Sequence, residues 1–132
     1  MKLTKNDIEK WSKHWNDESK DALQTAQDLY QAERYHHALF FCHLAVEKEL
    51  KAFYVEKKET FPPPVHDLLY LLKKSEIILT QELTEDLVEL NSFNIRARYD
   101  DYKKEFYKKA TKRYGEKWIK KASDIISTLK NI

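Results

Sequence analysis

Three polar side chains spaced four residues apart give the chain its first candidate chemistry. His43, Glu47 and Lys51 would stand above one another on a helix, because residues at i and i+4 are neighbours on its surface. A carboxylate favours the charged form of a nearby imidazole, so His43 and Glu47 could form an ion pair. The row lies one position beyond an apolar stripe, which predicts that it is half-buried. It is either an ordinary ladder of ion pairs or the edge of a groove or dimer contact.

Two arginines in the segment NIRARYDD, residues 94–101, are the second candidate. Guanidinium groups suit bidentate contacts with phosphates and carboxylates. Arg96 and Arg98 would lie about 200° apart around a helix, so we expect one of them to face inward. Tyr99 and Asp100 follow directly. Three interpretations are open: favourable charges at a helix C-terminus, contacts with RNA or nucleotide phosphates, or salt bridges to a partner protein.

A basic segment follows, in which residues 102–121 carry nine Lys or Arg and two Glu, a local charge of +7. Such a run attracts phosphates, although an ordinary solvated helix surface can have the same composition. With a single glycine, the chain has no glycine-rich phosphate loop, which excludes Walker-type and Rossmann-type nucleotide sites. The five histidines lack metal-ligand spacing, and the single cysteine, Cys42, lies in an apolar stripe. We therefore expect no metal, no cofactor and no catalytic residue.

The elements that must position these residues are helices. The chain has 132 residues, of which 42% are hydrophobic and 35% charged, which suits one domain spanning residues 1–132. One glycine and three adjacent prolines leave few turn signals for hairpins. We predict an all-α fold, an up-and-down bundle of about five helices. The N-terminus lacks a signal peptide and no window is long enough to span a bilayer, so we expect a cytoplasmic protein without membrane contact.

The first two helices are predicted from caps and periodicity. Thr4 and Asp7 have the spacing of a capping box and start the first helix. The pattern resets at residues 32–35, so the second helix should return antiparallel over residues 35–57. The inward side of the first helix is expected to carry Ile8, Trp11, Trp15, Ala22, Ala26 and Leu29.

Three prolines, residues 62–64, end the second helix and predict a stiff connector. A short helix should then cover residues 66–74, and a fourth should begin after Thr80 or Thr84 and end near Ile95. Beyond it, aromatic and small residues recur every four positions. On a helix each such step shifts the position around the axis by about 40°. We therefore predict two pieces with a break near Gly115.

Taken together, these segments resemble the HEPN domain (higher eukaryotes and prokaryotes nucleotide-binding). The family's motifs are His-x-x-x-Glu-Lys-x-x-Lys-Ala in the second helix, a proline-containing link to His-Asp-Leu, and Arg-Tyr-Pro-Asp ending the fourth helix. The order and spacing hold over nearly the whole chain, with two aspartates in place of Pro-Asp. The matching residues here are His43, Glu47, Lys48, Lys51, Ala52, His66, Asp67, Leu68, Arg98, Tyr99, Asp100 and Asp101.

The resemblance implies a helical bundle that commonly forms a homodimer. In prokaryotes such proteins are often encoded beside a minimal nucleotidyltransferase, and many of the pairs act as toxin and antitoxin. Some members are ribonucleases that use an Arg-x4–6-His motif across the dimer. Here Tyr102 and Lys104 stand six residues after the two arginines, and no histidine follows His66, so that general base is missing.

We therefore expect a protein that binds a nucleotide or RNA and acts with a nucleotidyltransferase partner in a toxin-antitoxin-like system. Two alternatives stay open: a residual ribonuclease that uses His66 or His43, and a non-catalytic helical dimer whose basic segment serves solubility. The expected binding residues are Arg96, Arg98, Tyr99, Asp100, His43, Glu47, Lys51 and His66.

Overall fold

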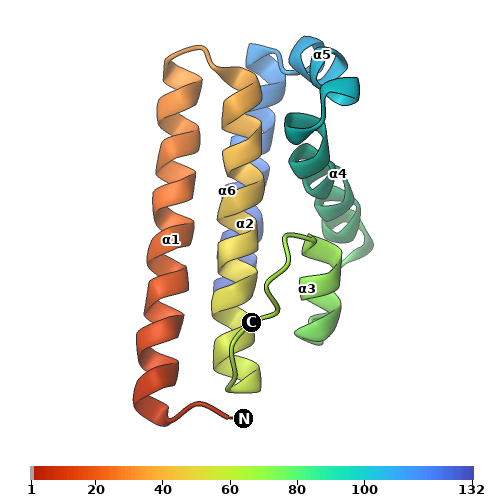
Figure 1. The fold of residues 1–132 in the computed structure, drawn as a ribbon. Coiled ribbons are helices and arrows are strands. Elements are labelled where there is room, and N and C mark those ends of the chain that lie inside the picture. The colour runs from red at the N-terminus through yellow and green to blue at the C-terminus, as the bar shows by residue number, and fades with distance from the viewer. Residues whose placement is uncertain (1) are drawn as a thin grey trace.

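A computed structural model describes residues 2–132, apart from the side chains of residues 100 and 101. Within these residues the chain forms six helices and no strand, which confirms the all-α fold and adds one helix to the expected number (Figure 1). The helices α1, α2 and α6 run alongside one another, and α4 flanks them. The bounds are α1 (Lys5–Gln31), α2 (Tyr35–Lys58), α3 (Leu68–Lys74), α4 (Gln81–Arg98), α5 (Asp100–Lys109) and α6 (Lys112–Lys130).

The start of α1 and the turn into α2 follow the sequence signals. Thr4 accepts a hydrogen bond from the Asp7 amide at 3.1 Å and the Asp7 carboxylate accepts one from the Thr4 amide at 3.4 Å, which completes the predicted capping box. Glu33 takes the left-handed conformation, with φ of 61°, in the tight turn between the helices. The Arg34 amide donates to the Leu29 carbonyl at 2.8 Å, which closes that turn.

The helix α2 is the central element of the bundle. It packs against α1, α3, α4 and α6, so it is covered on most of its circumference. Its polar side chains can therefore be buried as completely as its apolar ones.

The predicted inward residues of α1 are buried only in part: Ala22 and Ala26 belong to the core, while Trp11 and Trp15 are partly exposed.

The later helix boundaries differ from the expectation by a few residues. The helix α3 begins at Leu68 rather than residue 66, because the Asp67 side chain accepts from the amides of Leu69 and Tyr70 and caps it. The helix α4 starts after Thr80, the earlier of the two expected starts, and continues past Ile95 to Arg98.

The last third of the chain forms two helices, as predicted, but the break lies at Thr111 and not at Gly115. The helical structure is interrupted between α5 and α6. There the Thr111 hydroxyl accepts a hydrogen bond from the Tyr114 amide at 3.2 Å and caps α6. Gly115 lies inside α6, and a Cβ atom there would approach Tyr30 Cδ1 to 3.3 Å. The glycine therefore permits the close approach of α6 to α1 rather than a turn. Among the described helices, none has the length and apolar content needed to cross a membrane.

Candidate functional site

Glu47 is the centre of a buried polar group, which we name the Glu47 cluster and define as His43, Glu47, Lys51 and His66. The Lys51 ammonium donates to Glu47 Oε2 at 3.1 Å and His66 Nδ1 lies 3.1 Å from Glu47 Oε1. His43 and Glu47 are fully buried and Lys51 is 5% exposed, so the prediction of a half-buried row is wrong. The reason is tertiary: the connector before α3 lies over this side of α2, and Lys51 also lies 5.2 Å from the Trp15 ring of α1.

His43 is held as a neutral imidazole. Its Nε2 lies 2.9 Å from the His66 carbonyl oxygen, and because a carbonyl only accepts, Nε2 must carry the proton. Its Nδ1 is buried, has no hydrogen-bond partner in the described part of the chain, and lies 4.0 Å from Glu47 Oε1. Burial lowers the pKa of His43 to about 4 despite the nearby carboxylate, and the Arg98 charge adds to the lowering. The expected charged His43–Glu47 pair is therefore wrong.

His66 is the exposed member of the Glu47 cluster, with about half of its side chain (53%) in contact with solvent. The residues that follow it are anchored to α4 through Asn91. The Asn91 side chain accepts from the Leu68 amide at 2.9 Å and donates to Asp67 at 3.2 Å. These bonds fix the start of α3, and so they keep the imidazole of His66 over the buried carboxylate.

Arg98 stands at the outer end of a stack that leads to the Glu47 cluster. Its Nε donates to Asn94 at 2.6 Å, and its guanidinium carbon lies 5.3 Å from the centre of the Phe40 ring. The Phe40 ring is stacked on His43 with centroids 6.3 Å apart. Tyr99 is 59% exposed beside it. The side chain of Asp100, also an expected site residue, lies outside the described residues.

Arg96 faces a different part of the molecule, as the spacing of the two arginines predicts. It donates to Glu89 Oε1 at 3.0 Å, and the same oxygen accepts from Lys109 and Tyr114 at 3.1 and 3.0 Å. These bonds join α4 to α5 and α6. The structure thus brings Arg98 together with the Glu47 cluster and gives Arg96 a structural partner of its own.

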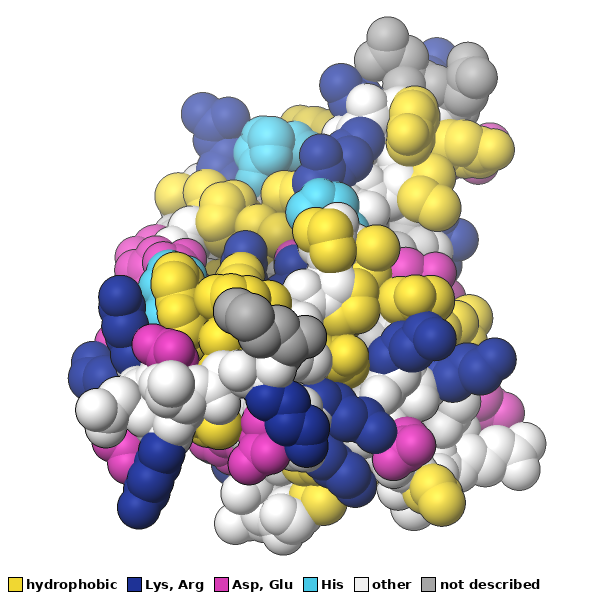
Figure 2. Space-filling view, turned by 60° about the horizontal axis from the view of Figure 1, so that its bottom comes forward, with side chains coloured by type: hydrophobic (Ala, Val, Ile, Leu, Met, Phe, Trp, Pro, Cys, Tyr) yellow, Lys and Arg dark blue, Asp and Glu magenta, His cyan; other side chains and the backbone are white. Residues whose placement is uncertain are grey.

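An aromatic surface beside α5 was not expected from the sequence. The Tyr107 ring is 65% exposed and its centroid lies 4.6 Å from that of His36. A cavity of about 300 Å³ between α2, α4 and α5 is lined by both, together with His37 and Lys103. The adjacent histidines His36 and His37 were the only sign of this surface in the sequence. Their contact with Tyr107 depends on how α5 packs against α2. Figure 2 shows Lys and Arg in several separate groups on one face, so positive charge alone marks no site on that face.

The described part of the chain contains neither a group of metal-binding side chains nor a reactive thiol. No three His, Cys, Asp or Glu side chains among those residues are placed to hold a metal ion. Burial raises the pKa of the Cys42 thiol to about 12, so this side chain stays protonated and serves the core.

Comparison with known proteins agrees with the fold. A model of the HEPN domain matches residues 12–132, a range that contains every expected site residue. The crystal structure of TT1696 from Thermus thermophilus is similar, with a TM-score of 0.78 and 20% sequence identity, over 91% of this chain and 96% of that one. At that identity the likeness shows the fold alone. No curated protein matches the chain.

Proposed function

Because this chain belongs to the HEPN domain family, we propose that it binds single-stranded RNA or a nucleotide through its phosphate at Arg98, beside the Glu47 cluster. The observation that carries the proposal is the placement of this one guanidinium. It is steadied by Asn94 and by the face of Phe40, and the residue is exposed. A planar, oriented guanidinium suits the bidentate recognition of phosphate.

The surroundings of Arg98 offer the other contacts that a nucleic acid needs. Tyr99 and Tyr102 are 59% and 52% exposed, and exposed tyrosine rings stack on unpaired bases. Lys104 and Lys108 are exposed on α5, four residues apart, and can follow a phosphate backbone. The Glu47 cluster supplies a rigid floor, since its buried charges hold the connector and α2 in one arrangement.

The test compares the two arginines. Binding of a fluorescent single-stranded RNA is measured at low salt for the unaltered protein, Arg98→Ala and the matched control Arg96→Ala. We expect Arg98→Ala to weaken binding about tenfold, the loss of one charge-assisted hydrogen-bonded contact. Arg96→Ala should change it by less than about twofold, since Glu89 already holds that side chain. Equal losses in the two variants, or affinity that does not fall with added salt, would contradict the proposal.

The proposal includes a homodimer and a minimal nucleotidyltransferase as protein partner in a toxin-antitoxin-like pair. Support for a protein contact comes from α4, where Val88 and Ile95 are 52% and 50% exposed and lie seven residues apart on one side. Light scattering coupled to size exclusion measures the oligomeric state, and Val88→Glu should shift a dimer to the monomer. Co-purification with a nucleotidyltransferase encoded beside this chain tests the second partner.

One observation favours ribonuclease activity as a second candidate function. The Glu47 carboxylate holds Nδ1 of the half-exposed His66, which orients the imidazole as general bases are oriented in other enzymes. His43 is a weaker candidate for the base, since its ring is buried and bonded to the His66 carbonyl. Labelled RNA incubated with His66→Ala should stay intact, while the exposed control His14→Ala should cleave like the unaltered protein. Cleavage by His66→Ala would rule out this role.

A further inference from the structure

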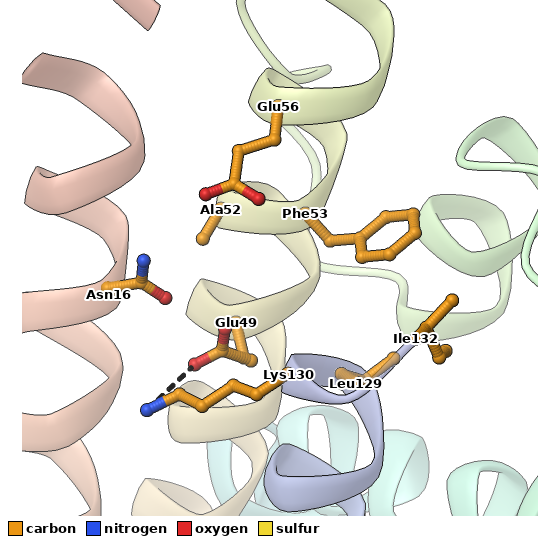
Figure 3. A pocket seen from close by; sticks show the side chains of 8 residues that line it. All are labelled: Asn16, Glu49, Ala52, Phe53, Glu56, Leu129, Lys130 and Ile132. Carbon is orange, nitrogen blue, oxygen red and sulfur yellow. Dashed lines mark ion pairs between the residues drawn. The ribbon is translucent and has the colours of Figure 1, made fainter. Parts of the chain in front are cut away.

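A polar cavity opens on the side of α2 that faces away from the Glu47 cluster. It lies between α1, α2 and the end of α6. Its volume is about 420 Å³, a size typical of small-molecule sites. Figure 3 shows Asn16 of α1, Glu49 and Glu56 of α2, and Lys130 of α6 around it, with Phe53 and Leu129 forming an apolar wall. Glu49 points about 200° away from Glu47 around the helix, so this cavity is separate from the Glu47 cluster.

Glu49 is buried without a complete set of partners. The residue is 4% exposed, and its Oε1 accepts no hydrogen bond from the residues that the structure describes. Burial raises the pKa of the carboxyl group, which Lys130 and Ser19 lower and Glu56 raises further. An unsatisfied buried acceptor destabilises the fold, so such an oxygen in a cavity calls for a donor.

Lys130 does not supply that donor in the structure. Its ammonium lies 3.9 Å from Glu49 Oε1, beyond hydrogen-bond range, and about half of the side chain (53%) is exposed. Glu56, in contrast, is fixed at the edge of the cavity, since its Oε1 accepts from Ser12 at 2.5 Å. The cavity therefore presents two carboxylates against one half-exposed lysine, and its polar lining is net negative.

We propose that this cavity binds a short aliphatic diamine. One ammonium group donates to Glu49 Oε1 and the Asn16 side-chain oxygen, and displaces the Lys130 ammonium toward solvent. The second ammonium group pairs with Glu56, and the hydrocarbon chain lies against Ala52, Phe53 and Leu129. Two like carboxylates that flank an apolar wall match the two charged ends and apolar middle of such a ligand.

Isothermal titration with 1,4-diaminobutane tests the proposal, with 1,4-butanediol as an uncharged molecule of the same shape. We expect the diamine to bind and the diol not to bind. Glu49→Gln should weaken diamine binding at least tenfold, whereas Glu18→Gln, an exposed residue of α1, should leave it unchanged. An absence of diamine binding, or an equal effect of the two substitutions, would overturn the proposal.

Two further variants keep the test independent of folding. Glu56→Gln changes an exposed residue and should weaken binding several-fold. Lys130→Met removes the competing ammonium and should strengthen binding about threefold, while the exposed control Lys120→Met should have no effect. Weaker binding to Lys130→Met would show that the lysine does not compete with the ligand and would overturn the arrangement. RNA binding by Arg98 should be unaltered in all of these variants, so the two proposals can fail separately.

Discussion

Glu47 and Glu49 stand two residues apart on the same helix, are both buried, and have opposite surroundings. Glu47 receives an ammonium and an imidazole at 3.1 Å, whereas one oxygen of Glu49 has no donor among the described residues. Burial alone therefore does not decide what a carboxylate does. The side chains aimed at it decide whether it stabilises the fold or is available to a ligand.

The sequence near each glutamate explains part of this difference. Four residues after Glu47 stands Lys51, which the helix itself brings alongside. Four residues after Glu49 stands Phe53, and four before it stands Ala45, so α2 offers no local cation. Glu49 must obtain its partner from another helix, and the end of α6 brings only the distant Lys130.

The largest effect is expected from Glu47→Gln. This substitution keeps the shape but leaves the buried Lys51 ammonium without a counter-charge, so the free energy of unfolding should fall by about 3–5 kcal/mol. Urea denaturation measures it. Adding Lys51→Met removes the stranded charge and should restore most of the loss. The contrast between the two glutamates fails if Glu47→Gln costs no more than Glu49→Gln.

The next largest effect is expected in the pH dependence of the free energy of unfolding, to which His43 and Glu49 contribute with opposite signs. The pKa of His43 is lowered from 6.5 to about 4, so the unfolded chain binds the extra proton first as the pH falls through that window. Stability should therefore fall between pH 6.5 and 4, by at most about 3 kcal/mol from this group.

Glu49 acts with the opposite sign. Its pKa is raised by burial, so the folded protein holds that proton more tightly and this contribution grows as the pH falls through the raised pKa. Urea titrations at several pH values should show a shallower acid loss in His43→Gln and a steeper one in Glu49→Gln. An unchanged slope in His43→Gln would mean that this imidazole is not the group concerned.

The smallest effect is expected from Glu49→Gln at pH 7. The amide removes a charge that burial disfavours, so the free energy of unfolding should stay the same or rise by up to about 1 kcal/mol. Lys130→Met should change it by less than about 0.5 kcal/mol, because that ion pair is long and half exposed. Thermal unfolding measures both, and a clear loss in Glu49→Gln would place this carboxylate with Glu47 as a structural group.

The sequence predicted that His43, Glu47 and Lys51 would form one row on a helix, but not that the row would be buried. Helical spacing alone aligned His43, Glu47 and Lys51, and the two-residue spacing separated Arg98 from Arg96. The sequence contained no sign that the connector would cover the row and take a hydrogen bond from His43. Phe40, which joins Arg98 to His43, was missed because its role depends on a contact between α2 and α4.

By itself the sequence determined what is local: the all-helical class, the Thr4 cap, the turn at residues 32–35 and the family motifs. These depend on spacing, capping and turn chemistry within a few residues. Tertiary structure decided the fit of Gly115 against Tyr30 and the different surroundings of Glu47 and Glu49. Each of these depends on which side chain a distant helix brings within a few ångströms, and the repeat of a single helix contains no such information.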